Sequence, residues 1–379
     1  MVDREISKTI IRYAKQYPVI TITGPRQSGK TTLTKMIFKE KEYVSLEDIE
    51  TRHFAINDPK GFLSHYMGKN TGSTKGIIID EIQHAPDLLS YIQVSVDKDR
   101  KAGRYILTGS QNLQLMKNIS QSLAGRTAIA TLLPFTLKEM SFLKGNRLVV
   151  DDILYSGFYP AIHNEGLNPT EALSFYVTTY LERDLRLLIN IKDLNRFTTF
   201  LKLCAGRTGQ VINLSSLSNE TGITHNTAKS WLSILEASFI IKLVQPYYKN
   251  LNKRLIKSPK LFFLDPGLAS FLIGIQNPEQ IFTHPLRGNL FETFVYSEIL
   301  KRRLNQGKTD NIYYYRDRKG NEIDFILDYG SSISNRQKNC IYHRVMQSAI
   351  FSCKENNCME GRYGESNKRD CEVLGRENI

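Results

Sequence analysis

The stretch Gly24-Pro-Arg-Gln-Ser-Gly-Lys-Thr31 decides the fold of the first part of this chain, because it matches the phosphate-binding pattern G-x-x-x-x-G-K-[ST] at every fixed position. The β-branched run Val19–Thr23 precedes it, and a helical stretch from Lys30 to Phe38 follows. Strand, glycine loop and helix in this order direct backbone N–H groups toward an anion at a helix N-terminus. A glycine turn with an incidental lysine is the alternative, and the flanking strand and helix argue against it.

The loop predicts a role for each of its residues in binding a nucleotide. Gly24 and Gly29 allow backbone torsions and a close approach that a Cβ would forbid. Lys30 would reach the β- and γ-phosphates, and Thr31 would give a hydroxyl to Mg²⁺, which takes only one or two protein ligands in such sites. The residues expected at the nucleotide are Gly24, Pro25, Arg26, Gln27, Ser28, Gly29, Lys30, Thr31 and Thr32.

A second buried strand is predicted from Gly76 to Glu81, where an apolar run ends in two carboxylates. A continuous apolar run is what a parallel sheet covered on both faces requires. Asp80 is expected to hold Mg²⁺, and Glu81 to orient and deprotonate an attacking water. A strand that runs into a solvated acidic loop is the alternative. The fold class that follows is α/β, a parallel P-loop sheet with helices on both faces.

Polar residues also follow a third strand, predicted from Arg104 to Thr108. Ser110 or Asn112 would sense the γ-phosphate from the carboxyl end of that strand, unless the segment is a plain turn. Further along, Arg126 follows a glycine, and its guanidinium suits bidentate contact with a phosphate. That contact would lie within the subunit or across a subunit boundary of a homo-oligomer. A surface arginine is the alternative for Arg126.

The composition sets bounds on partners and on compartment. The 379 residues include 51 Lys and Arg against 38 Asp and Glu, a formal net charge of +13, which favours an anionic partner. The 41% hydrophobic and 23% charged residues are globular values, and no apolar run approaches the roughly 20 residues that span a bilayer. The residues from Met1 to Ile11 lack the apolar region of a signal peptide. We therefore expect a cytoplasmic protein with no membrane segment.

Four motifs together resemble a large prokaryotic family of AAA+ ATPases. They are the glycine loop and the stretches Ile79-Asp-Glu-Ile-Gln83, Leu107-Thr-Gly-Ser110 and Leu123-Ala-Gly-Arg126. In that family an ATPase domain is fused to a C-terminal region of unknown function, and the resemblance continues more loosely through Tyr180–Leu185 to about Tyr329. It implies ATP binding and ATP hydrolysis, with ATP and Mg²⁺ as cofactors. It names no substrate for the C-terminal region.

The middle of the chain carries helix-turn-helix spacing. Residues 160–169 indicate a linker, and a helical pattern follows in which Arg183 and Asp184 would contact nucleotide or form a structural ion pair. Asn213–Gly222 and Thr224–Phe239 then predict two helices, with Thr224 as N-cap of the second.

Two strands of a wing are expected at 240–247 and 261–264. Between Ala237 and Leu264 the chain has a basic run without acids, made of Lys242, Lys249, Lys253, Arg254, Lys257 and Lys260. DNA contact would involve Thr224, His225, Asn226, Lys229, Lys253 and Arg254. The alternative is a winged helix used for packing or partner contact, with the lysines on a solvated face.

The next segment resembles the start of a restriction-endonuclease-like core. The helix from Gly288 to Glu298 and a hairpin over 311–327 would place Glu292 and Asp324 in the first two acidic positions of such a site. The Glu-x-Lys that the resemblance requires within about 20 residues of Asp324 is absent. Nuclease activity is therefore not expected.

Residues 331–379 show neither alternation nor a sustained apolar face, and they contain four of the five cysteines. We interpret them as an aberrant tail from a frame-shifted reading of the gene. A zinc site is the alternative, although no close C-x-x-C pair occurs. The expected domains are an ATPase domain (1–160), a helical and winged-helix region (170–275), a partial nuclease-like segment (285–330) and the tail (331–379). The expected function is ATP hydrolysis coupled to action on nucleic acid; the alternative is a nucleotide-gated switch whose C-terminal half binds a protein partner. A kinase is a third possibility, which the pair Asp80 and Glu81 weakens.

Overall fold

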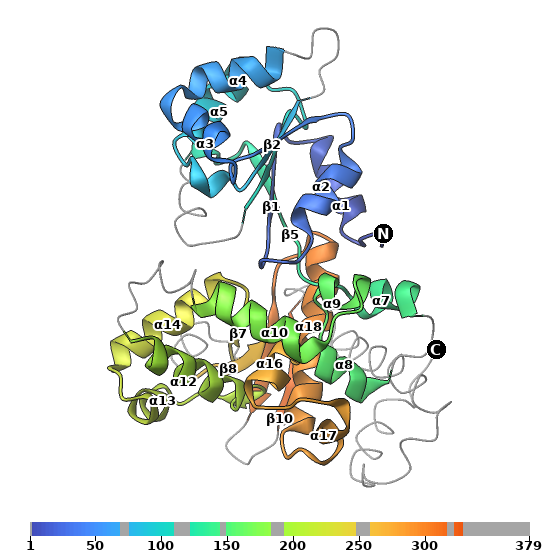
Figure 1. Ribbon diagram of the computed structural model, residues 1–379, viewed down its shortest axis with the longest axis vertical. Coiled ribbons are helices and arrows are strands. Elements are labelled where there is room, and N and C mark those ends of the chain that lie inside the picture. The colour runs from blue at the N-terminus through green and yellow to red at the C-terminus, as the bar shows by residue number, and fades with distance from the viewer. Residues whose placement is uncertain are drawn as a thin grey trace.

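A computed structural model describes the chain over residues 2–68, 76–109, 122–144, 149–182, 193–247, 258–316 and 322–328. Figure 1 shows two lobes, an N-terminal lobe built on one sheet and a larger C-terminal lobe rich in helices. Several residues singled out from the sequence lie outside the described ranges: Ser110, Asn112, Arg183, Asp184, Lys253, Arg254 and the whole of 331–379.

The N-terminal lobe contains a parallel sheet, as predicted, and the sheet has five strands. Its strands are β1 (Val19–Thr23), β2 (Glu42–Ser45), β3 (Ile77–Asp80), β4 (Tyr105–Thr108) and β5 (Thr127–Thr131), in the order β2-β3-β4-β1-β5. The register sets Ile20 of β1 opposite Ile106 of β4 and Ala128 of β5. Strand β5 was not predicted, because its small and polar residues make a weak strand pattern.

Helices cover both faces of this sheet, because alternate strand residues point to opposite sides. Ile20 and Ile22 pack with α1 (Ser7–Ala14) and α2 (Lys30–Ile37). Val19 packs on the other side, with the cluster formed by α3 (Ile49–Asn57), α4 (Pro59–Gly68) and α5 (Leu88–Lys98). Figure 1 shows the two sets of helices on either side of the strands. Since the strands are parallel, all their carboxyl ends meet at one edge, and that edge faces the C-terminal lobe.

The C-terminal lobe is mostly helical, with two small antiparallel sheets of order β6-β8-β7 and β10-β9. Its elements are α7 (Leu137–Lys144), α8 (Val150–Ser156), α9 (Pro160–Asn164), α10 (Pro169–Tyr176), the π-helix η2 (Val177–Glu182), α12 (Leu194–Ala205), β6 (Gln210–Val211), α13 (Leu214–Thr221), α14 (His225–Ala237), β7 (Ile241–Val244), β8 (Lys260–Phe263), α16 (Pro266–Leu272), α17 (Pro278–Thr283), α18 (Arg287–Asn305), β9 (Ile312–Arg316) and β10 (Glu322–Leu327).

One hydrophobic core runs through this lobe, from Leu133 to Leu327. The packing therefore changes from one lobe to the other near Leu133, earlier than the expected boundary at residue 160. The expected linker is structured: α9 lies within it, and Ile162 is part of the core. The regions 170–275 and 285–330 share this core rather than forming separate ones. The long helix α18 joins the lobes, because it contacts both β8 and β5.

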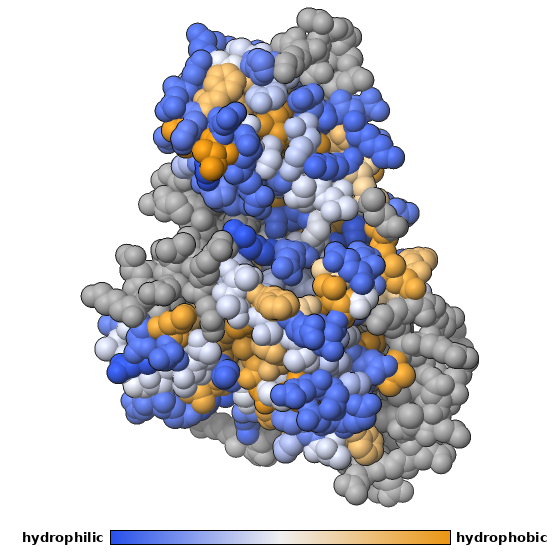
Figure 2. Space-filling model, viewed as in Figure 1, coloured by the Kyte–Doolittle hydropathy of each residue, from blue (hydrophilic) through white to orange (hydrophobic). Residues whose placement is uncertain are grey.

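The surface gives little indication of a single apolar docking face. Figure 2 shows mainly hydrophilic residues on the face in view, with separate hydrophobic spots over both lobes. The most exposed large apolar side chains, Phe142, Phe282 and Phe175, come from three different helices. Among the described residues no helix is both long and apolar enough to cross a membrane.

Candidate nucleotide site and a lysine-centred carboxylate cluster

The glycine loop connects β1 to α2 at the carboxyl edge of the sheet. Gly24 has a φ of +149°, and a Cβ built on it would lie 2.0 Å from the carbonyl oxygen of Leu132. Gly29 is the N-cap of α2 with a φ of +90°. Both glycines are therefore required by the backbone, the first because of a close approach and the second because of its left-handed torsion. The α2 N-terminus lies directly behind the loop, as the sequence predicts.

Lys30 is more deeply buried than Arg26, the other cation of the loop, and only 6% of its surface is exposed. Its ammonium donates to the carbonyl oxygens of Gly24, at 3.1 Å, and Pro25, at 2.8 Å. Burial lowers the pKa of Lys30 to about 8, since Glu81 and Asp80 compensate only in part. Two neutral carbonyls are weak partners for a buried charge, so the site favours an additional anion close to this ammonium.

Asp80 gathers three hydroxyl groups at the end of β3. Its Oδ2 accepts from the Thr31 hydroxyl at 2.8 Å and from the Tyr43 hydroxyl at 2.7 Å, and its Oδ1 accepts from Thr108. The structure thus brings together Thr31 and Asp80, the two residues predicted to hold Mg²⁺. Hydroxyl and carboxylate oxygens are ligands that Mg²⁺ prefers, so this pair fits the ion. Sequence reasoning missed Tyr43 and Thr108, which carry no motif of their own.

Glu81 lies next to this pair in an unusual backbone conformation. Its φ of 56° and ψ of 48° are left-handed, and the residue caps the short 3₁₀ helix η1 (Ile82–His84). The side chain accepts a hydrogen bond from Gln83. Of the acidic groups that raise the pKa of Lys30 against the effect of burial, Glu81 contributes most. A strained residue at a strand end is a frequent sign of a functional position.

Other loop residues face in different directions. The Ser28 side chain is buried and donates to the Pro25 carbonyl at 2.9 Å, whereas Gln27 and Thr32 are exposed. The Arg26 guanidinium lies 5.5 Å from the ring centre of Tyr180 in η2. The loop therefore contacts the C-terminal lobe directly, which the sequence did not predict.

Arg126 is not where a phosphate contact within the subunit requires it. It immediately precedes β5, and the residue after it, Thr127, pairs with Val19 at the amino-terminal start of β1. Arg126 thus sits at the edge of the sheet opposite the glycine loop. Its guanidinium makes a bidentate pair with Asp97 of α5, at 2.6 and 2.9 Å. A role within the same active site is therefore wrong, because the whole length of β1 separates the two.

The helix predicted to contact nucleic acid begins as expected. Thr224 is the N-cap of α14, and its side chain accepts from the Thr227 backbone N–H at 3.1 Å, which confirms the predicted cap. Thr224, His225, Asn226 and Lys229 are exposed.

The basic run beyond α14 differs from the expectation. Lys242 pairs with Glu236 at 3.1 Å and with Asp310 at 3.2 Å, so it is not a free surface cation.

A second polar cluster is centred on Lys260 at the start of β8. Its ammonium contacts Glu292 of α18 at 2.5 Å, Glu322 at 2.8 Å and Asp324 at 3.3 Å, the last two on β10. Burial alone would lower the pKa of Lys260, but these carboxylates raise it above its ordinary value. Burial, together with Asp324, raises the pKa of Glu292 to about 8. Glu292 and Asp324 thus do lie close together, as the resemblance implied.

The sequence predicts Lys260 to be part of the basic run that could contact phosphates. The structure corrects this, because Lys260 is buried among three acidic side chains. It lies 32 residues before Glu292 in the chain, so no spacing rule links the two. The ammonium occupies the place where the carboxylates converge. In the described part of the chain, no group of three or more His, Cys, Asp or Glu is arranged to hold a metal ion.

Comparison with known proteins divides the chain between residues 141 and 148, and again between residues 279 and 287. Residues 16–141 match the family described as AAA domain, residues 148–279 match a domain of unknown function (DUF8612), and residues 287–335 match another (DUF4143). An uncharacterized protein of Mycobacterium tuberculosis is 28% identical over 358 residues, covering 92% of this chain and 77% of the relative. An uncharacterized protein of Methanocaldococcus jannaschii is 23% identical, covering 81% of this chain and 71% of the relative.

Among solved structures, a Walker-type ATPase of Pyrococcus abyssi has a TM-score of 0.49 at 17% identity, with 72% of this chain and 96% of that chain covered. The glycine loop, the Thr31–Asp80 pair and the parallel sheet all lie within the residues that match the AAA family. The chain therefore contains an AAA domain with a P-loop at residues 16–141, which is followed by two domains of unknown function.

Proposed function

We propose that the protein binds ATP together with Mg²⁺ at the glycine loop and hydrolyses it. The observation that carries this is Lys30, a buried ammonium whose hydrogen bonds within the described residues go to the carbonyls of Gly24 and Pro25, beside the Thr31–Asp80 pair. A triphosphate offers Lys30 the charged partner that the loop lacks. The AAA domain match supports the same ligand.

The residues of the site divide the work of hydrolysis between them. Lys30 would leave the two carbonyls and contact the β- and γ-phosphates, while the backbone N–H groups of the loop bind the phosphate oxygens. Thr31 and Asp80 would hold Mg²⁺, which neutralises phosphate charge when bound. Glu81 would orient a water and take its proton, because it directly follows Asp80 at the carboxyl end of β3, the same edge of the sheet as the glycine loop.

For the output of hydrolysis, action on nucleic acid has the better support. The element order α12, β6, α13, α14, β7, β8 and the sheet order β6-β8-β7 support the expectation of a winged helix. The first residues of α14, which a winged helix presents to DNA, are exposed and include His225 and Asn226. The alternative remains a nucleotide-gated switch whose C-terminal half binds a protein partner, and Lys242 and Lys260, both paired with acids, leave fewer cations for phosphates.

Glu81→Gln tests the hydrolysis step. The variant should bind ATP with unchanged affinity and release phosphate about 10²–10⁴ times more slowly, because only proton transfer is lost. Glu50→Gln, an exposed acid on α3, is the control and should match the wild type. Wild-type turnover in Glu81→Gln would refute the assigned base.

Adding DNA to the ATPase assay distinguishes action on nucleic acid from a partner-binding switch. Action on nucleic acid predicts that duplex DNA raises the rate of ATP turnover, and that Lys229→Glu in α14 removes this stimulation. Lys202→Glu, exposed on α12, should keep it. Turnover that is indifferent to DNA would favour the partner-binding switch.

A further inference from the structure

Arg4, which precedes α1, contacts both the glycine loop and the segment that leads into the C-terminal lobe. Its Nη1 donates to the Ser28 carbonyl of the loop at 2.8 Å. Its Nη2 donates to the carbonyls of Leu133 at 2.6 Å and Pro134 at 3.3 Å, and its Nε pairs with Glu139 at 3.1 Å. The guanidinium is 7% exposed and lies 5.0 Å from the ring centre of Phe135. A guanidinium fork can hold such divergent acceptors at once, whereas a lysine ammonium cannot match this geometry.

The residues Leu133–Leu137, which we call the strap, join β5 to α7 and receive Arg4 on one side. Glu139 fixes the end of the strap: its Oε2 accepts from the Thr136 N–H at 2.9 Å, and its own N–H donates to the Thr136 hydroxyl at 3.1 Å. This reciprocal pair is a capping box at the start of α7. Glu139 is fully buried, and its Oε1 also accepts from the Glu5 N–H at 2.6 Å. The strap is thus held rigidly to the segment that carries Arg4.

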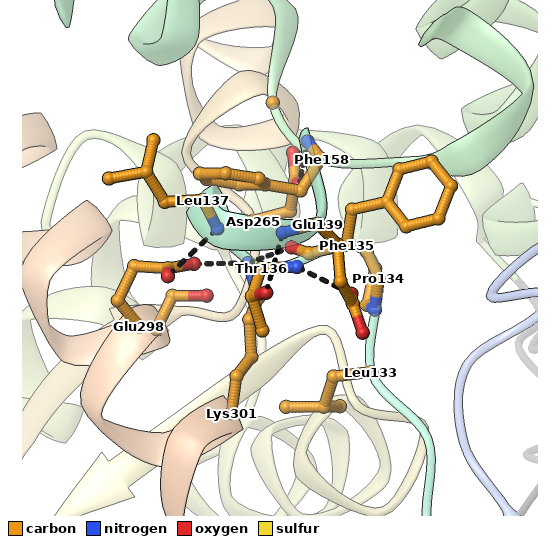
Figure 3. Close-up of polar contacts among 12 residues, drawn as sticks. Leu133, Pro134, Phe135, Thr136, Leu137, Glu139, Phe158, Asp265, Glu298 and Lys301 are labelled. Atoms are coloured by element: carbon orange, nitrogen blue, oxygen red, sulfur yellow. Dashed lines mark hydrogen bonds and ion pairs between the residues drawn. The ribbon is translucent and has the colours of Figure 1, made fainter. Parts of the chain in front are cut away.

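On its other side the strap is held by α18 (Figure 3). The Lys301 ammonium donates to the Phe135 carbonyl at 2.8 Å, and Glu298 accepts from the Leu137 N–H at 2.9 Å. Lys301 and Glu298 pair with each other at 3.0 Å. Burial raises the pKa of Glu298, although the charge of Lys301 opposes this. A continuous chain of buried polar contacts therefore leads from Ser28 through Arg4 and the strap to the middle of the lobe-joining helix.

We propose that Arg4 is a positioning residue of the nucleotide site and that the strap couples nucleotide binding to α18. This rests on the proposed ATP site. When Lys30 leaves the carbonyls of Gly24 and Pro25 for phosphate, the loop must readjust, and the Ser28 carbonyl that Arg4 holds belongs to the same loop. The Arg4 guanidinium passes the change to the strap, and Lys301 and Glu298 pass it to α18. By linkage, a change at α18 alters nucleotide affinity by the same factor.

Hydrogen–deuterium exchange of the full chain with and without the non-hydrolysable analogue AMPPNP tests the coupling. In the wild type, the analogue should slow exchange in residues 24–37 and also in the strap and in residues 298–305 of α18. In Arg4→Lys the analogue should still slow exchange in 24–37, but the change in the strap and α18 should disappear. Nucleotide affinity should fall about fivefold or more, in the usual range of coupling between sites.

Arg12→Lys is the matched control, because Arg12 also reaches α18, at the Gln306 carbonyl, but does not contact the loop. It should leave both affinity and exchange as in the wild type. Glu298→Gln acts from the far end, and it should weaken nucleotide binding several-fold without contacting the loop.

One result with the wild type would overturn the proposal. In that result the analogue slows exchange in the loop but leaves exchange in the strap and α18 unchanged. Wild-type coupling in Arg4→Lys would overturn it as well. If the analogue left even residues 24–37 unchanged, the ATP site itself would be refuted, and the coupling with it.

Discussion

Lys30 and Lys260 are both buried lysines beside carboxylates, yet their surroundings shift their pKa values in opposite directions. The Lys30 ammonium donates to two loop carbonyls, and burial lowers its pKa to about 8. The Lys260 ammonium contacts three carboxylates directly, and they raise its pKa. The difference is one of charge compensation: Lys30 has too little negative charge around it, and Lys260 has more than enough.

This difference distinguishes a ligand site from a structural cluster. A cation short of anions gains when an anionic ligand arrives, whereas a cation enclosed by three acids has no further charge to attract. Lys260 also connects β8, α18 and β10, three elements of one core. The two lysines should therefore separate function from stability when each is replaced.

The largest effect is expected from Lys260→Met. Removing this ammonium leaves the carboxylates of Glu322 and Asp324 without their buried counter-charge and Glu292 without its hydrogen-bond partner, and the free energy of unfolding at pH 7 should fall by about 3 kcal/mol. That is the lower end of the range for broken buried pairs, because Glu322 and Asp324 are partly exposed. Urea unfolding measures it. A variant as stable as the wild type would contradict the charge explanation.

The next effect is a pH dependence of ATP binding. Phosphates favour the charged form of Lys30, and free Lys30 loses its proton as the pH rises through about 8. Affinity should therefore fall with increasing pH above 8, by at most about tenfold per unit. Titration calorimetry between pH 6.5 and 9.5 checks this. Lys30→Arg, which stays protonated throughout, should lack the fall. An affinity of the wild type that does not change with pH would exclude the lowered pKa.

In the Lys260 cluster, Glu292 should make the stability of the fold, rather than ATP binding, depend on pH. Its pKa is raised to about 8 in the fold, against about 4.3 in the unfolded chain, so the folded state holds a proton that the unfolded state has lost between these values. Stability from this group is therefore present at low pH and declines as the pH rises from about 4.5 to 8. Glu292→Gln should flatten that decline in thermal melts taken across the window. A steeper decline in the variant would show that the sign is wrong.

The smallest effect is expected at Arg126. Its pair with Asp97 is at the edge of the sheet away from the loop, so Arg126→Ala should leave ATP turnover of a monomer unchanged. Mass measurement with and without ATP analogue should accompany the assay. A homo-oligomer whose turnover depends on Arg126 would assign this residue to a neighbouring subunit's site, and a monomer slowed by the substitution would contradict the placement.

What the sequence predicted and what it missed follow from distance along the chain. The glycine loop with α2 and the end of β3 are each specified by a short run of neighbouring residues. Gly24, Lys30 and Asp80 therefore lie where these local patterns predict them. For Arg126, the sequence could not decide between a contact within the subunit and one across a subunit boundary, because β5 has no clear strand pattern that would indicate which end of the strand Arg126 precedes. Lys260 and Arg4 were missed because their partners come from elements that meet only when the chain is folded.

Phosphate release from Mg²⁺-ATP by the wild type, Lys30→Met and Lys260→Met is the most direct measurement, made at a temperature where circular dichroism shows all three folded. The wild type and Lys260→Met should turn over ATP at similar rates. Lys30→Met should be slower by about 10²–10³, because the donor for the developing phosphate charge is gone. Wild-type turnover in Lys30→Met would contradict the assignment of the glycine loop as the ATPase site.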